Sequence, residues 1–143
     1  MPKLRLPYFD LSAEALTGLR SVKSYLENSA LNKTLLEWVY LRVSQINGCS
    51  FCLKLHSKAL RAAGENNERL DSLAGWHSNP LFSEQERAAL QWAESLSQIA
   101  TTHAPDADFD ILNKYFNEQE ISDLTFAIAN MNALNRVAIA MRQ

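Results

Sequence analysis

Apolar residues recur along most of this chain at the three- and four-residue spacing of amphipathic helices. No stretch alternates apolar and polar residues as a half-buried strand would, and only four glycines and four prolines interrupt the 143 residues. The pattern predicts an all-α, single-domain bundle of about six or seven helices over residues 1–143, preceded by an irregular arm at 1–11. The helices are expected at about 12–27, 32–47, 49–63, 67–74, from 83 onward, 108–116 and 118–141.

Local signals support several of these helix ends. Residues 83–86 read Ser-Glu-Gln-Glu, the form of a capping box, which satisfies unpaired N–H groups at a helix start. Asn47-Gly48 ends the second helix, because glycine readily adopts the left-handed conformation that terminates helices. Residues 75–80 are expected to form a loop.

The last helix, 118–141, is apolar on more than one face. Within its residues 124–141 the polar exceptions include the small amides Asn130, Asn132 and Asn135. A helix that is apolar nearly all round needs cover on several sides. We therefore expect the protein to form a homo-oligomer.

Composition narrows the classes of partner and compartment. The net charge is -2 and the pI is near 5.9, which gives no general reason to expect nucleic acid or an anionic membrane as partner. The first residues lack the apolar core of a signal peptide, and no apolar run is long enough to span a bilayer. We expect a soluble cytoplasmic protein. Permanent structural disulfides are rare in the cytoplasm, because cellular thiols keep cysteines reduced there.

The two cysteines of the chain, Cys49 and Cys52, stand three apart. Two cysteines placed at random in this length would do so only about one time in seventy. The spacing lets one helical turn close and reopen a disulfide, and Gly48 places the pair at a helix start. Unpaired N–H groups and the helix dipole there favour the thiolate, which is the reactive form.

His56 lies four residues after Cys52, so both side chains share a helix face, and imidazole is a common base for thiols. If the chain folds back at Gly48, Glu37 lies about 16 Å up one arm and His56 about 12 Å up the other, at 1.5 Å per residue. A Glu37–His56–Cys52 relay is therefore geometrically feasible. The helix dipole favours Cys49 as the more acidic thiol, whereas the base favours Cys52, which we prefer because it acts over a shorter range.

Two other interpretations of the pair remain open. The cysteines can be two small core residues. Alternatively, Cys49, Cys52, His56 and Glu37 can together provide four zinc ligands, although structural zinc sites more often show a second ligand pair. We expect neither a metal nor an organic cofactor.

Glu37, the C-x-x-C pair, His56 and Gly64 lie within a core motif at residues 37–64, of which residues 41–64 read "LRVSQINGCSFCLKLHSKALRAAG". In this motif the chain resembles the AhpD-like alkylhydroperoxidases of the carboxymuconolactone decarboxylase superfamily. The resemblance implies an all-α fold that assembles as a trimer or hexamer. It also implies reduction of small hydroperoxides, with a dihydrolipoyl or thioredoxin-like dithiol protein as reductant.

By position, the resemblance assigns Cys52 as the attacking thiol that becomes sulfenic acid, and Cys49 as its disulfide partner and proton donor. His56 becomes a proton relay that Glu37 orients. The best-studied branch has a histidine where this chain has Phe51. Alternative functions are therefore a disulfide reductase that serves another peroxidase, or a non-enzymatic oligomeric redox sensor. Lactone decarboxylation, which the superfamily name suggests, does not need a C-x-x-C pair.

Overall fold

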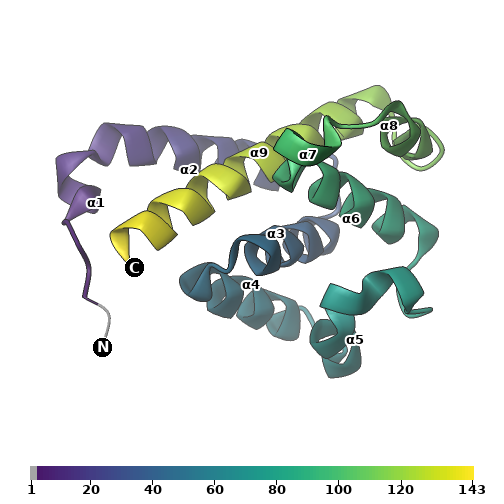
Figure 1. The fold of residues 1–143 in the computed structure, drawn as a ribbon, viewed down its shortest axis with the longest axis horizontal. Coiled ribbons are helices and arrows are strands. Elements are labelled where there is room, and N and C mark those ends of the chain that lie inside the picture. Colours follow the sequence, from purple (N-terminus) through teal and green to yellow (C-terminus); the bar gives the residue numbers. More distant parts are fainter. Residues whose placement is uncertain (1–2) are drawn as a thin grey trace.

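Helices make up all of the regular structure in residues 3–143, the part of the chain that the computed structural model describes (Figure 1). The all-α prediction is therefore confirmed. In chain order the elements are α1 (Tyr8–Leu11), α2 (Ala13–Glu27), α3 (Lys33–Asn47), α4 (Ser50–Ala62), α5 (Asn67–Ser72), the 3₁₀ helix η1 (Leu73–Ser78), α6 (Glu84–Ser97), α7 (Ile99–Thr102), α8 (Asp106–Leu112) and α9 (Glu118–Met141).

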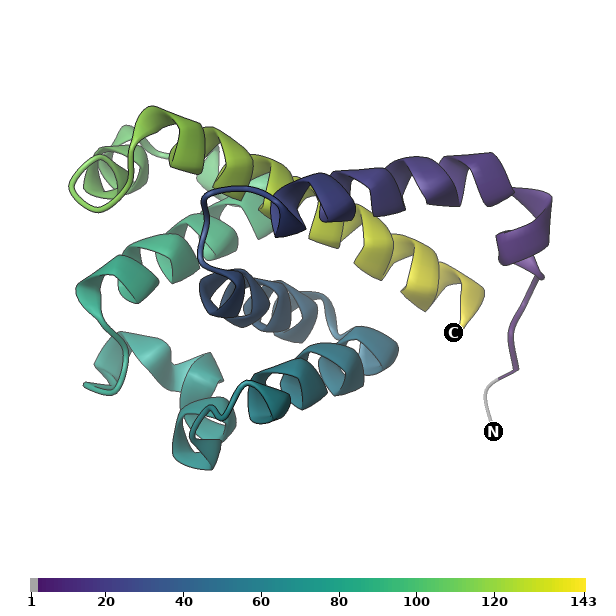
Figure 2. The ribbon, with the colours of Figure 1, turned by 180° about the vertical axis from the view of Figure 1, so that it is seen from behind.

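Helix α3 lies at the centre of the arrangement. Helix α4 folds back beside it, α6 and α9 pack against its other sides, and α2 runs along α9 (Figures 1 and 2). A helix covered on several sides must be apolar on more than one face. In α3, Val39 faces one buried cluster and its neighbour Trp38 faces another.

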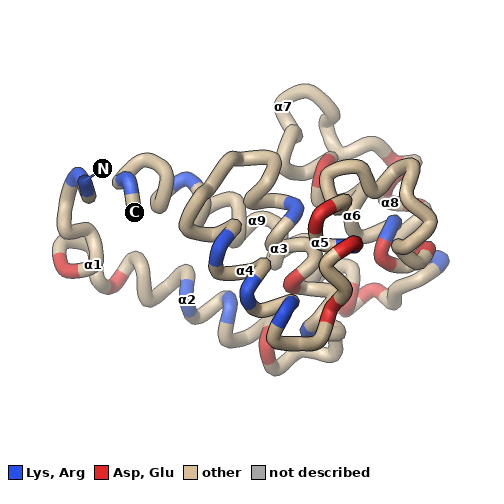
Figure 3. Tube along the Cα trace, turned by 90° about the horizontal axis from the view of Figure 1, so that it is seen from below, with Lys and Arg blue, Asp and Glu red and all other residues tan. Residues whose placement is uncertain are grey.

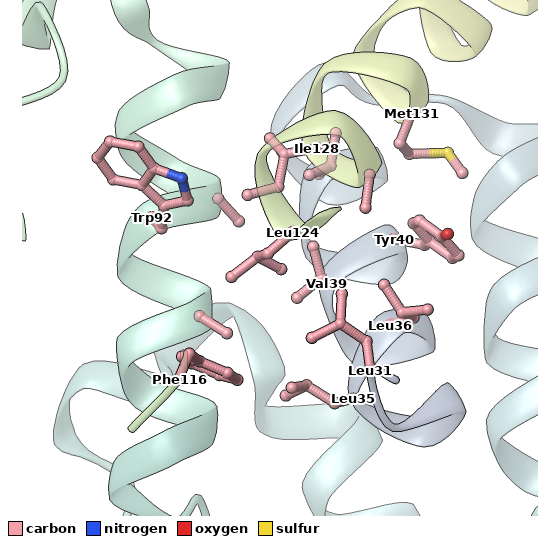
Figure 4. Packing of buried hydrophobic residues seen from close by; sticks show 14 of the residues in the cluster. Leu31, Leu35, Leu36, Val39, Tyr40, Trp92, Phe116, Leu124, Ile128 and Met131 are labelled. Carbon is pink, nitrogen blue, oxygen red and sulfur yellow. The ribbon is translucent and has the colours of Figure 1, made fainter. Parts of the chain in front are cut away.

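The larger cluster fills the space between α3, α6 and α9. Figure 4 shows Trp92 of α6 and Leu124 and Ile128 of α9 beside Val39 and Leu36 of α3. Each side chain of this size contributes about 1.5–3 kcal/mol when it is fully removed from water. This cluster therefore fixes how α3 lies against α6 and α9, and with it the position of the α3 carboxyl end.

The predicted helix from 118 to 141 coincides with α9, and the capping box at Ser83 is present with both of its hydrogen bonds. Differences are confined to short elements. One-turn helices form at α1 and α7, and η1 occupies most of the expected loop 75–80. Helix α8 begins two residues earlier and ends four residues earlier than the expected helix 108–116. One-turn elements are too short to show an apolar period, so the sequence pattern does not reveal them.

No helix among the described residues is both long and apolar enough to cross a bilayer. Although α9 is long, Asp123, Asn130 and Asn135 are buried within it as polar groups.

The turn between α3 and α4 is unusually short. Gly48 ends α3 in the left-handed conformation, at φ 70° and ψ 38°. The N–H groups of Gly48 and Cys49 donate to the carbonyls of Gln45 and Ser44, which is the double closure of a Schellman motif. Cys49 is at the same time the N-cap of α4. One residue therefore separates the end of the first helix from the cap of the second, and the two helices form a tight hairpin.

The same substitution at two glycines should change stability in opposite directions. Gly48→Ala should lower the free energy of unfolding by about 1–2 kcal/mol, because a side chain in the left-handed region is strained. Gly18→Ala lies inside α2 with open space around its Cβ position, and should raise the free energy by about 1 kcal/mol through helix propensity. Urea unfolding of the reduced proteins measures both values. Equal shifts of the same sign would show that the turn conformation at Gly48 does not constrain the fold.

Candidate active site

Cys49 and Cys52 are joined by a disulfide at the start of α4, with their Cα atoms 5.3 Å apart. The Cys49 sulfur also accepts a hydrogen bond from the backbone N–H of Cys52 at 3.4 Å, so it caps the helix. Both residues are buried and pack against Ala138 of α9. The predicted C-x-x-C pair at a helix start is therefore present, in its oxidised form.

His56 and Glu37 meet across the α3–α4 hairpin. The His56 Nδ1 atom and the Glu37 Oε2 atom are 2.8 Å apart, and the His56 side chain is only 2% exposed. An ionised carboxylate can only accept a hydrogen bond, so Nδ1 is the donor in this contact, and Nε2 lies on the other side of the ring. Glu37 and His56 therefore lie as close together as their matched levels in a hairpin predict.

Tyr40, one turn after Glu37 on α3, packs its ring against the imidazole, with centroids 5.2 Å apart. Its place in the sequence gives no sign of this contact, because an aromatic residue in an apolar stripe is typical of a core. Burial raises the pKa of Tyr40 well above its ordinary value, and the carboxylates of Glu37 and Glu27 raise it further. Tyr40 is therefore a neutral phenol near neutral pH that limits movement of the His56 ring without adding charge.

The two sulfurs line different hollows. Cys52 and His56 line a cavity of about 190 Å³ between α2, α4 and α9, which we call the Cys52 cavity. Cys49 lines a second hollow of about 380 Å³, together with Gly48 and residues near the end of α9 such as Ile139 and Arg142. A small molecule in the Cys52 cavity therefore has one sulfur and the imidazole beside it.

Buried amides hold the turn against α9, a role that the sequence analysis did not assign. The Asn47 side chain donates to Asn132 and Asn135 of α9 at 2.9 and 3.0 Å. Asn135 in turn donates to the hydroxyl of Ser44 at 3.1 Å. Amides on an otherwise apolar helix were the available signal, but their partners depend on the tertiary fold. These hydrogen bonds hold Asn47, the last residue of α3, against α9.

The zinc interpretation finds no support in this geometry. Within residues 3–143 no three histidine, cysteine or acidic side chains are gathered closely enough to hold a metal ion. The disulfide also occupies both sulfurs that such a site would need as thiolates.

Comparisons with known proteins agree with this fold. The sequence profile of the carboxymuconolactone decarboxylase family matches residues 11–95. The uncharacterized protein YdfG of Bacillus subtilis is 31% identical over 137 residues, covering 96% of this chain and 93% of YdfG. The alkyl hydroperoxide reductase AhpD of Bradyrhizobium diazoefficiens is 42% identical over 45 residues, 32% of this chain and 25% of that protein.

Among solved structures, the Agrobacterium tumefaciens protein ATU0492 superposes with a TM-score of 0.94 at 35% identity, covering 99% of this chain and 97% of that one. It is described as a protein of unknown function and assigned provisionally to antioxidant defence as an AhpD. The family profile spans more than half of this chain. YdfG and ATU0492 each match this chain over nearly their whole length. The protein therefore belongs to the carboxymuconolactone decarboxylase family, in its AhpD-like branch.

Proposed function

We propose that this protein is a thiol peroxidase that reduces small hydroperoxides through a cycle of Cys52 and Cys49. The observation that carries the proposal is that Cys52 shares a cavity with His56, whose other ring nitrogen is held by Glu37. A nucleophile beside a base that a third group orients is the arrangement expected for thiol activation. The family includes enzymes, and the Bradyrhizobium relative is an alkyl hydroperoxide reductase.

The first half of the cycle oxidises one thiol. In the reduced protein, Cys52 gives its proton to His56 Nε2, and the thiolate attacks the outer oxygen of the hydroperoxide. The O–O bond breaks, an S–O bond forms, and the alkoxide leaves as the alcohol after it takes a proton from His56. Glu37 stabilises the imidazolium in between.

The second half closes the disulfide. The sulfur of Cys49 attacks the sulfenic acid of Cys52, its thiol proton combines with the departing hydroxide, and water is released. The dithiol has then lost two electrons and the peroxide has gained them. The disulfide in the structure joins the same two sulfurs that this step would link, which supports the proposal.

A dithiol donor must return the two electrons, and we propose a dihydrolipoyl or thioredoxin-like protein. The hollow beside Cys49 offers a donor thiol a route to that sulfur that does not pass through the Cys52 cavity. Attack of one donor thiol on Cys49 expels Cys52 as thiolate, and the proton of the donor thiol passes to Cys52 through His56. The second donor thiol then displaces Cys49, and the donor leaves as a disulfide.

A disulfide relay for another peroxidase is the second candidate function. Phe51 stands where the best-studied branch has a histidine, and it is 41% exposed beside the pair. An apolar side chain at that place supplies no proton to a leaving alkoxide, but it does not hinder thiol–disulfide exchange. The two functions therefore differ in whether peroxide itself is consumed.

The cysteines should behave differently when each is replaced. One equivalent of hydroperoxide added to reduced Cys49→Ser protein should leave a sulfenic acid on Cys52, because the partner thiol is absent. Cys52→Ser protein should consume no peroxide above the rate of a free thiol. Mass spectrometry with a sulfenic-acid trapping reagent measures both outcomes, and the wild-type protein should show only the disulfide.

Two other results would contradict the peroxidase proposal, and a third would change the roles of its thiols. Fast exchange with a disulfide substrate and no loss of peroxide would favour the relay. A change of assembly on oxidation without turnover would favour a sensor. Oxidation at Cys49 in Cys52→Ser protein, at the wild-type rate, would reverse the roles of the two thiols.

We also propose that the protein works as a homo-oligomer. Phe126 of α9 is 60% exposed and lies with Tyr25 of α2 beside a hollow of about 400 Å³. Large aromatic side chains grouped at the surface are typical of interfaces. A second subunit bound to this surface would give the apolar helix α9 the additional cover that its composition requires.

Sedimentation velocity tests the assembly. The wild-type protein should sediment as an oligomer, and Phe126→Glu should shift it toward the monomer, because a carboxylate would be buried without a partner. Leu81→Glu, at an exposed leucine outside this surface, should leave the assembly unchanged. A monomeric wild-type protein at micromolar concentration would overturn the proposal, as would an oligomer that resists Phe126→Glu.

A further inference from the structure

The Cys52 cavity has apolar walls on two sides. Phe51 and Leu55 of α4 line it and are 41% and 44% exposed, while Met131 and Leu134 of α9 line it from the other side. Apolar side chains left partly in water at the mouth of a cavity favour a ligand with an apolar body. The volume of about 190 Å³ holds roughly six groups the size of a water molecule, so it admits a small molecule or the reacting end of a larger one.

The third wall carries positive charge. Arg20 and Lys23 of α2 line the same cavity, and their spacing places them on one face of the helix. Within residues 3–143 neither side chain makes an ion pair, and no aspartate or glutamate is among the residues that line the cavity. In contrast, Arg42, Arg69 and Arg87 all pair with carboxylates of the chain.

Helix α4, on the opposite side of the cavity, carries further basic residues, none of which lines the cavity itself. It contains Lys54, Lys58 and Arg61 and no acidic residue, and Figure 3 shows blue positions along both α2 and α4, the two helices that flank the cavity. Lys58 lies one turn beyond Leu55 on the same side of α4. The protein has a net charge of -2, so this positive region is local and does not reflect the overall charge. An anionic ligand is therefore attracted to this mouth in particular.

We infer that the preferred substrates are organic hydroperoxides that carry a carboxylate, with the apolar body held by Phe51, Leu55 and Met131 and the carboxylate held by Arg20 and Lys23. This inference rests on the proposed peroxidase function and names its substrate class. A guanidinium matches a carboxylate with two parallel hydrogen bonds, and a lysine adds a point charge. The hydroperoxide end then points to Cys52, whose sulfur takes the outer oxygen while the remainder leaves as a hydroxy acid.

A pair of matched probes tests the inference. Cumene hydroperoxide with a carboxyl group in the para position and the methyl ester of the same compound differ in charge but share the reacting group. Stopped-flow measurement of thiol loss in the reduced protein gives a second-order rate constant for each probe. We expect the carboxylate to react about five- to tenfold faster at low ionic strength, since two partly exposed charge pairs are each worth a few-fold. The preference should shrink as salt is added.

The variants separate recognition from effects on the thiol. In Arg20→Gln/Lys23→Gln protein the ratio of the two rate constants should fall to about one, with the ester rate nearly unchanged. Lys114→Gln removes one positive charge just beyond the carboxyl end of α8, away from the cavity, and should keep the wild-type ratio. The oxidative step needs no reductant, so docking of a donor protein does not enter the measurement.

Each other outcome overturns the inference in a recognisable way. Equal rates for the two probes in the wild-type protein would leave the peroxidase proposal intact and remove the substrate class. Equal slowing of both probes in the double variant would assign the two cations to the thiol and not to the substrate. If the double variant slows only the complete cycle with a dithiol protein as reductant, Arg20 and Lys23 bind that donor protein and not the substrate. If neither probe oxidises the thiols, the proposed function itself fails.

Discussion

The contact between the Glu37 carboxylate and the His56 imidazole exists because two helices run back along each other from a single turn. Gly48 in the left-handed conformation ends α3, and Cys49 caps α4 immediately afterward. With so short a connection, the two arms cannot slide past each other, so their levels are fixed by the helical rise. A residue inserted at the turn would shift α4 along α3 and separate Glu37 from His56, while Cys52 and His56 would keep their places on α4.

The rest of the structure supports this hairpin. The apolar cluster between α3, α6 and α9 holds α3 in place, and the amides of Asn47 and Asn135 tie its end to α9. Ala138 packs on the disulfide, so α9 also forms one side of each hollow next to the two sulfurs. The site is thus assembled from rigid elements, which suits chemistry that requires an orienting group, a base and a thiol in a fixed order.

Much of this site was predictable because it is local. The four-residue step from Cys52 to His56 and the matched levels of Glu37 and His56 depend only on helix geometry and one turn. The walls of the Cys52 cavity were not predictable, since Arg20 and Met131 come from distant parts of the chain and meet only through tertiary packing. Tyr40 was equally hidden, because a ring that packs on an imidazole has the same sequence pattern as a ring in the core.

A double-mutant cycle on Glu37 and His56 tests the central claim most directly. The rate of Cys52 oxidation by hydrogen peroxide is measured in a single turnover of reduced wild-type, Glu37→Gln, His56→Asn and doubly substituted protein. If Glu37 acts only through His56, the His56 variant should be slower by a factor of about 10² or more, and the double variant no slower than that. Two independent effects that multiply in the double variant would contradict the account, as would wild-type rates in both single variants.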